Sequence, residues 1–168
     1  MSETIYQQLK KIKAIAMDVD GVLTDGTLLC TDSGEWIRRM NIKDGYAIAH
    51  AVKQGLHLAV ISGSIGEGVK LRMQRLGIEF IYQDVADKGN KLKEWMESLK
   101  VSKEEVMFIG DDMPDIPALK LAGLACCPKD AVPEVHEVCK YISPFNGGDG
   151  CVRDIIEKVM KLQGTWNA

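Results

Sequence analysis

The sequence predicts an α/β protein in which one doubly wound, Rossmann-like, mostly parallel sheet carries helices on both faces. Short apolar runs alternate along the chain with helical segments of about three turns. Right-handed crossovers between parallel strands place such helices on both sides of a sheet. No linker, repeat or low-complexity segment divides the 168 residues. The whole chain, 1–168, is therefore expected to form a single domain.

Six short apolar runs are expected to form the strands. The first, "AIAMDV", begins with four apolar residues and is a candidate central strand. The fourth, "EVMFIGDDMPD", ends in acids, and the fifth, "LACC", is short. In chain order the runs lie at 14–19, 56–64, 78–83, 105–115, 124–127 and 140–143.

A hairpin insertion is expected between the first strand and the first helix, at about 27–40. "TLLC" and "EWIRRM" are two extended segments, and the turn "TDSG" between them is rich in Asp, Ser and Gly. No other segment is long enough to form a separate cap domain.

The helices are predicted from apolar residues at helical spacing. The first ends at Gly55 and the second at Gly77, and glycine is a common residue just after a helix. The third places Leu92, Trp95 and Met96 on one face. The predicted helices are 43–55, 65–77, 87–100, 116–123, 133–139 and 150–163, and the tail "GTWNA" is expected to be loose.

Composition excludes several classes of protein. A formal net charge of -3 argues against a general nucleic-acid binder, which normally has a basic face. No run approaches the ~18 apolar residues of a membrane span, and the N-terminus is too polar for a secretory signal. The five cysteines form no CxxC pair, which favours reduced thiols in a cytoplasmic protein.

Polar side chains follow four of the predicted strands. Ligands of parallel sheets bind outside the carboxyl ends of the strands, so neighbouring strands would bring these residues together. The first strand leads to two acids, the second to a small polar loop, the third to a lysine and the fourth to three acids. The residues are Asp18 and Asp20; Ser62, Gly63 and Ser64; Lys88; and Asp111, Asp112 and Asp115.

This set of residue types predicts a site for Mg²⁺ and a phosphate. Clustered carboxylates repel one another, and a hard divalent cation with oxygen ligands relieves the repulsion. Lys88, the hydroxyl of Ser62 and the backbone N–H groups near Gly63 are suited to phosphate oxygens. An aspartate can attack phosphorus, and a second acid can protonate the leaving oxygen and later deprotonate water.

At these motifs the sequence resembles the haloacid dehalogenase superfamily of phosphohydrolases. "DVDGVLTDG", "VISGS", "VADKGNK" and "FIGDDMPD" match its four motifs in order. The resemblance covers nearly the whole chain. It is sharpest to the capless branch that includes the octulosonate-phosphate phosphatases, because "NIKDGYAI", "LGIEFIYQ" and "GGDGCVRDIIEKV" are similar to that branch.

The resemblance implies a role for each motif residue. Asp18 would be the nucleophile and a Mg²⁺ ligand. Asp20 would be the general acid and base, with its backbone carbonyl on the metal. Asp111 would be the third ligand, and Asp112 and Asp115 would support the metal or its waters. Ser62, Gly63 and Lys88 would bind the phosphoryl group.

The resemblance also implies a substrate and an assembly. The substrate would be a phosphorylated 2-keto-3-deoxy sugar acid, foremost 3-deoxy-D-manno-octulosonate 8-phosphate in lipopolysaccharide precursor synthesis. The branch is homotetrameric: its hairpin builds the interface, and subunits complete each other's sites. The loop "PFNGGDG", which opens the C-terminal segment at about 144–162, is a candidate to enter a neighbouring site.

Ser64 departs from the branch pattern and leaves the sugar acid open. The eight-carbon phosphatases often carry Arg there, and a nine-carbon keto sugar acid 9-phosphate phosphatase has an acid. Arg72, about one turn into the following helix, is a candidate ligand for a substrate carboxylate. Two other classes remain as alternatives: a phosphoacceptor signalling domain, and an assembly module without turnover.

Overall fold

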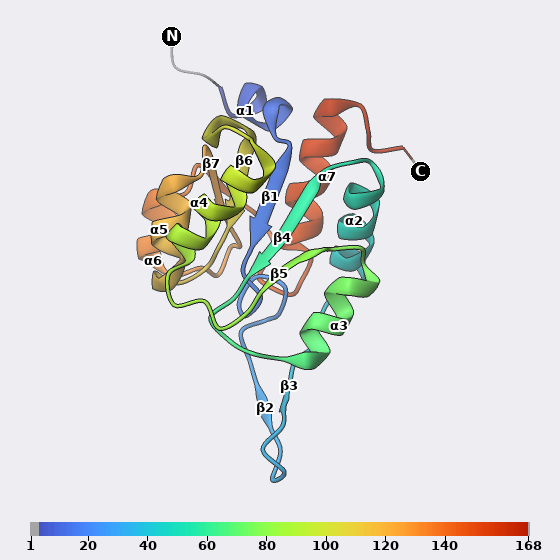
Figure 1. The fold of residues 1–168 in the computed structure, drawn as a ribbon, viewed down its shortest axis with the longest axis vertical. Coiled ribbons are helices and arrows are strands. Elements are labelled where there is room, and N and C mark those ends of the chain that lie inside the picture. The colour runs from blue at the N-terminus through green and yellow to red at the C-terminus, as the bar shows by residue number, and fades with distance from the viewer. Residues whose placement is uncertain (1–3, 168) are drawn as a thin grey trace.

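Six strands form one parallel sheet in the computed structural model, which describes residues 4–167 (Figure 1). Every neighbouring pair in this sheet is parallel, which confirms the predicted fold class. The spatial order is β5-β4-β1-β6-β7-β8. The strands are β1 (Ala14–Met17), β4 (His57–Ile61), β5 (Phe80–Tyr82), β6 (Val106–Ile109), β7 (Leu124–Cys127) and β8 (Tyr141–Ile142).

Strand β1 lies at the centre, where the direction of the chain through the sheet reverses. From β1 the chain passes to β4 and β5 on one side, and then returns to β6, β7 and β8 on the other. All four residues of β1 are buried, because helices cover both faces. Because of this reversal, the carboxyl ends of β1 and β6 are the usual ligand position for an open α/β sheet.

Alternate residues of the central strands enter two separate cores. Ile15 and Met17 of β1 belong to one core, and Ala14 and Ala16 belong to the other. The first core contains residues of α1 (Ile5–Lys11), α2 (Ile42–Lys53), α3 (Glu67–Arg75) and α7 (Cys151–Gln163). The second contains residues of α4 (Lys88–Leu99), α5 (Ile116–Leu121) and α6 (Pro133–Val138). Figure 1 shows these two groups of helices on opposite sides of the sheet.

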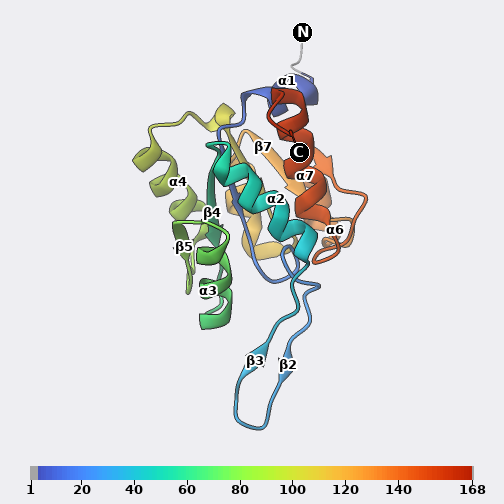
Figure 2. The same cartoon turned by 90° about the vertical axis from the view of Figure 1, so that its right-hand side faces the viewer.

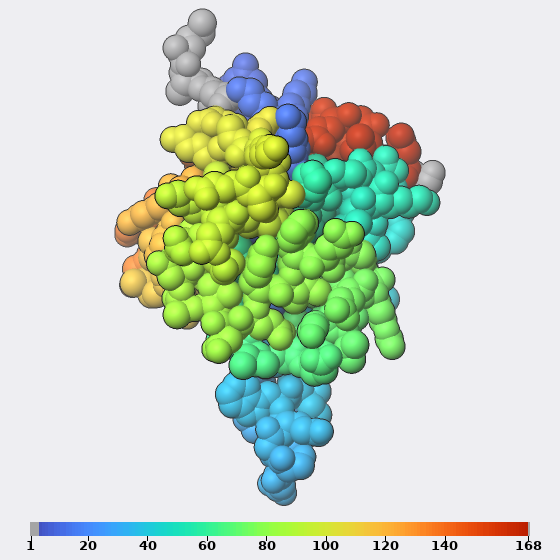
Figure 3. Space-filling view, viewed as in Figure 1, coloured from blue at the N-terminus to red at the C-terminus, as the bar shows by residue number. Residues whose placement is uncertain are grey.

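The hairpin insertion projects beyond the carboxyl edge of the sheet. Its strands, β2 (Leu29–Cys30) and β3 (Trp36–Ile37), are shorter than the predicted extended segments and are exposed on all four residues. Figures 2 and 3 show the hairpin as an arm extending away from the body of the molecule. It pairs only with itself, in an antiparallel two-stranded sheet.

Both ends of the described chain are more ordered than the sequence indicated. Helix α1 was not predicted, and Thr4 caps it in a capping box with Gln7. The prediction of a loose tail was wrong for Thr165 and Trp166. The Thr165 N–H donates to Met160, and the Arg153 guanidinium lies 4.5 Å from the centre of the Trp166 ring. Ala168 of that predicted tail lies outside the described residues.

Two short 3-10 helices, η1 (Lys103–Glu105) and η2 (Met113–Asp115), flank β6. The second begins directly after the acids that end this strand. Within residues 4–167, no helix has an apolar stretch of the length needed to cross a membrane.

Candidate active site

Three adjacent strands, β4, β1 and β6, deliver the predicted polar residues to one edge of the sheet. Asp18 follows β1, Ser62 follows β4 and Asp111 follows β6, since these strands lie side by side. Lys88 reaches the same place from the first position of α4, where Asp87 caps the helix. The sequence prediction that these residues share one edge is confirmed.

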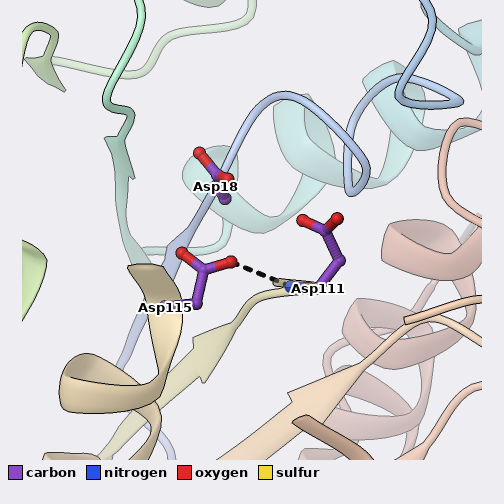
Figure 4. A group of neighbouring side chains, drawn as sticks. All are labelled: Asp18, Asp111 and Asp115. Atoms are coloured by element: carbon purple, nitrogen blue, oxygen red, sulfur yellow. Dashed lines mark hydrogen bonds between the residues drawn. The ribbon is translucent and has the colours of Figure 1, made fainter. Parts of the chain in front are cut away.

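Asp18, Asp111 and Asp115 form a tight cluster of carboxylates at the carboxyl ends of β1 and β6. One oxygen from each lies within 4.8 Å of the others, and Figure 4 shows the three side chains around a common space. Asp115 is held on both oxygens: one accepts from Lys88 at 2.6 Å, and the other accepts from the Asp111 N–H at 2.9 Å. Asp115 therefore fixes the loop that carries Asp111.

Lys88 is buried between two of these acids. Its Nζ lies 2.8 Å from Asp18 and 2.6 Å from Asp115, and the residue is only 4% exposed. Burial lowers the pKa of Lys88, but the charges and hydrogen bonds of Asp18 and Asp115 outweigh it and hold the pKa above its usual value. The ammonium group therefore stays charged beside the cluster.

The remaining negative charge of the cluster is poorly compensated. Burial, reinforced by the charge of Asp115, raises the pKa of Asp111 to about 8. Burial and Asp115 also raise the pKa of Asp18 to about 7, although Lys88 opposes the shift. Asp111 Oδ1 is buried and has no hydrogen-bond partner within the described part of the chain. A free, buried carboxylate oxygen in an all-oxygen set suits a hard divalent cation such as Mg²⁺.

Glycine is required at two positions behind this cluster. Gly21 has φ +88, and a Cβ placed there would lie 2.0 Å from Asp111 Oδ2. Gly147 lies directly behind it, because a Cβ there would lie 1.9 Å from the Gly21 oxygen. The glycines of the loop that was predicted to enter a neighbouring site thus pack against the loop after β1 of their own chain, where the Gly148 N–H donates to the Val22 carbonyl.

Asp20 does not join the acid cluster but pairs with Arg38, the residue that leads out of β3. Arg38 Nε donates to Oδ1 of Asp20 at 2.7 Å, and Nη2 donates to Oδ2 at 3.0 Å. Burial would raise the pKa of Asp20, but the hydrogen bonds from Arg38 and Ser64 and the Arg38 charge hold the pKa below its usual value.

Arg38 was not among the site residues predicted from the sequence. It stands in the hairpin, 18 residues from Asp20, next to another arginine, Arg39, whose side chain is 81% exposed. Nothing in the local pattern separates the two arginines, because the fold of the hairpin root alone decides which of them turns inward.

The loop after β4 folds onto itself beside Asp20. The Ser64 N–H donates to Ser62 Oγ at 3.1 Å, and Ser64 Oγ donates to Asp20 at 2.9 Å. Gly66, not Ser62, occupies the N-cap of α3. Ser62 is buried, whereas Gly63 is exposed and leaves its backbone accessible to a ligand.

Two further predicted residues, Asp112 and Arg72, also lie outside the acid cluster. Asp112 is exposed, and its side chain accepts from the Met113 N–H, where it caps η2. Arg72 lines a cavity of about 690 Å³ between the hairpin and α3, and Arg38 lines the same cavity. The Arg72 guanidinium also packs closely against Gly45 of α2.

Comparison with known proteins places this site in a family. The sequence profile of the haloacid dehalogenase-like hydrolases matches residues 70–155. The 3-deoxy-D-manno-octulosonate 8-phosphate phosphatase KdsC of Escherichia coli strain K12 is 31% identical over 164 residues, 98% of this chain and 87% of that protein. The chain belongs to the haloacid dehalogenase-like hydrolases.

Solved structures of this hydrolase family share the whole fold. The 3-deoxy-D-manno-octulosonate 8-phosphate phosphatase of Moraxella catarrhalis, solved with a magnesium ion, a phosphate ion and a KDO molecule, has a TM-score of 0.94 at 33% identity and covers 96% of this chain and 93% of its own. The Yersinia pestis enzyme has a TM-score of 0.93 at 30% identity, with 96% and 87% covered.

The two acids of the first motif lie in different surroundings. Asp18 lies in an acid cluster that could hold a metal ion, beside a buried lysine. Asp20 lies outside the cluster, and both of its carboxylate oxygens accept hydrogen bonds from Arg38 or Ser64.

Proposed function

We propose that this protein is a Mg²⁺-dependent phosphomonoesterase that hydrolyses 3-deoxy-D-manno-octulosonate 8-phosphate in lipopolysaccharide precursor synthesis. The observation that carries the proposal is the buried cluster of Asp18, Asp111, Asp115 and Lys88 at the carboxyl edge of the sheet. Relatives named as phosphatases for this compound align over nearly the whole chain, which supports the choice of substrate.

The metal would be held by carboxylates of the cluster. Asp18 and Asp111 would supply side-chain oxygens, and Asp20 would supply its backbone carbonyl. Asp115 and Asp112 would support the metal or its waters, and the bonds from Asp115 to Lys88 and to the Asp111 N–H suit a supporting role. When bound, Mg²⁺ supplies positive charge that lets the Asp18 carboxylate and the phosphate approach each other.

The first half of the reaction transfers the phosphoryl group to Asp18. Its carboxylate oxygen attacks phosphorus, the bond from phosphorus to the sugar oxygen breaks, and Asp20, which has first taken a proton from solvent, donates that proton to the leaving oxygen. Lys88, Ser62 and the backbone N–H of Gly63 hold the phosphoryl oxygens, since positioning and charge stabilisation are the main contributions to phosphoryl transfer.

The second half releases phosphate. Asp20, now ionised, takes a proton from a water molecule, and the resulting hydroxide attacks phosphorus in the aspartyl phosphate. The bond from phosphorus to Asp18 breaks, and the carboxylate is restored. Because Asp18 lies beside Lys88 at 2.8 Å, it returns to an ion pair at the end of the cycle.

The acid end of the substrate would lie toward α3. Arg72 lines the cavity beside the hairpin and is the proposed ligand of the carboxylate, with Ser64 near the leaving oxygen. A nine-carbon keto sugar acid 9-phosphate is the alternative substrate, and parallel assays of the two compounds distinguish them.

The chain would assemble as a cytoplasmic homotetramer through its hairpin. Leu29, Trp36 and Ile37 of the hairpin and Ile65 near it are largely exposed apolar side chains, and such patches are typical of protein interfaces. All five cysteines are free thiols, which is consistent with a reducing compartment. The particle mass in solution tests this assembly.

Phosphate release with and without Mg²⁺ tests the proposed function. Wild-type protein is expected to turn over octulosonate 8-phosphate only with the metal. Asp18→Asn is expected to lose activity by roughly a thousandfold or more, because an amide is not a nucleophile for phosphorus. Asp32→Asn, a matched change at an exposed hairpin acid, is the control. Activity that survives Asp18→Asn would refute the mechanism.

A further inference from the structure

Both oxygens of Asp20 are engaged by its own chain. Arg38 donates to each of them, at 2.7 and 3.0 Å, and Ser64 Oγ adds a third hydrogen bond at 2.9 Å. The Arg38 side chain is only 5% exposed, and it donates to Ser64 as well, at 3.1 Å. This is a bidentate, charge-assisted pair, the strongest class of side-chain hydrogen bond.

In this arrangement Asp20 has no carboxylate oxygen free for a substrate. A general acid or base must come within hydrogen-bond reach of the oxygen whose proton it moves. A guanidinium cannot take the place of the acid, because it does not deprotonate in proteins. Arg38 therefore has to leave Asp20 before the leaving oxygen can be protonated.

The cavity beside the hairpin offers Arg38 another partner. Arg38 and Arg72 both line this space of about 690 Å³, and Arg38 Nη1 lies at its wall near Gly66. Glu35 and Glu67 also line the cavity and offset the charges of the two arginines, so the cavity does not attract anions in general. A carboxylate that reaches the guanidinium groups makes the planar, bidentate contact for which arginine is suited.

We propose that Arg38 is a specificity-determining residue: the carboxylate of a sugar-acid substrate draws its guanidinium away from Asp20 and so frees the acid and base. The exchange replaces one ion pair by another and moves no proton. A phosphate ester without a carboxylate leaves Arg38 on Asp20 and reacts slowly. This inference rests on the proposed function, since it assigns how the same site selects its substrate.

Selectivity measurements test this role. The quantity is kcat/KM, at saturating Mg²⁺, for octulosonate 8-phosphate and for fructose 6-phosphate, a ketose phosphate without a carboxylate. In Arg38→Gln, turnover of fructose 6-phosphate is expected to rise, and the preference for the acid is expected to fall by roughly tenfold or more. Arg38→Lys keeps the positive charge but not the bidentate guanidinium. Its preference for the acid is expected to lie between those of wild type and Arg38→Gln.

A matched control and a binding measurement complete the test. Arg39→Ala changes the neighbouring arginine, which is exposed and pairs with Asp25, and it is expected to keep the wild-type preference. By calorimetry, Arg38→Gln is expected to bind free octulosonate about tenfold more weakly than wild type, which a purely structural role would not produce.

Several outcomes would overturn the proposal. Equal losses on both substrates would show that Arg38 only supports the structure, and an unchanged preference would show that it does not select. If Arg38→Gln does not fold, a substrate preference in Arg38→Lys equal to that of wild type would likewise overturn the proposal. In each of these cases wild-type turnover of octulosonate 8-phosphate leaves the proposed function intact, whereas no turnover of either ester by wild type would overturn both.

Discussion

Asp18 and Asp20 stand two residues apart and meet opposite surroundings. Asp18 is buried beside Asp115, and burial raises its pKa to about 7. Asp20 is paired with Arg38 and keeps a pKa below its usual value. Environment, not residue type, thus separates the two acids, as is common in sites that use a pair of carboxylates.

The raised pKa values of Asp18 and Asp111 predict that Mg²⁺ binding depends on pH. At pH values below about 7 to 8 these groups hold protons that a metal has to displace, so affinity is expected to fall by up to about tenfold per pH unit and released proton. The rise in melting temperature caused by Mg²⁺ should be larger near pH 8.5 than near about pH 6.

The stability of the metal-free protein should fall as pH rises, whereas the stabilisation caused by Mg²⁺ should grow. Its folded state binds protons on Asp18 and Asp111 that the unfolded chain, with carboxyl pKa values near 3.8, does not bind. Its stability is therefore greatest at low pH within this window and falls as pH rises from about 4 through about 8. An equal Mg²⁺ effect at both pH values would contradict this account, and Asp111→Asn should lose the effect at both.

The residues of this edge of the sheet were predictable because each follows a strand, and the carboxyl ends of parallel strands meet. The Arg38 contact was not predictable. It depends on how the hairpin root bends and on which of two adjacent arginines faces inward, and local periodicity does not encode either.

Helix α2 supplies a capping contact to the N-terminus of helix α7. Gly150, the N-cap residue of α7, has no side chain to cap the helix, and Asp44 of α2 accepts instead from the Arg153 N–H at 2.6 Å. This contact fixes the helix that follows the glycine loop, and Gly147 of that loop lies behind Gly21. The position of the catalytic loop therefore depends on a cap supplied by another helix.

Removal of this cap is expected to destabilise the fold. Asp44→Ala should lower the free energy of unfolding by about 1–3 kcal/mol, because it leaves the partly buried Arg153 N–H without its capping partner. Asp44→Asn keeps an acceptor oxygen, and since burial raises the pKa of Asp44, a neutral amide should cost less. Urea unfolding of both variants measures the difference, and an Asp44→Ala variant as stable as wild type would rule out the capping role.

The central elements were predictable to within a few residues, whereas the ends were not. The strands and longer helices have apolar patterns that match one or two buried faces. Helix α1 is short and mostly polar, so its pattern is weak. The tail is held by the Thr165 N–H, which donates to Met160, and by Trp166, which packs against His50 of α2 and Arg153 of α7.

On the scale of the whole molecule, a single sheet carries the chemistry and a small arm lies beside it. The acid cluster lies at the carboxyl edge of the sheet where the chain reverses at β1, and the hairpin supplies Arg38 to the same edge. Since no cap domain covers this edge in the described residues, the hairpin and α3 are the elements of this chain that can recognise the leaving group.

The central claim is that Asp18 carries the phosphoryl group during turnover. Acid quenching of wild-type protein within the first turnover of octulosonate 8-phosphate and Mg²⁺, followed by mass spectrometry of the peptide containing Asp18, tests it most directly. The account predicts a peptide heavier by one phosphoryl group on Asp18, absent after full turnover and absent in Asp18→Asn. Rapid phosphate release in which the phosphoryl group is never found on Asp18, or is found on another residue, would contradict the claim.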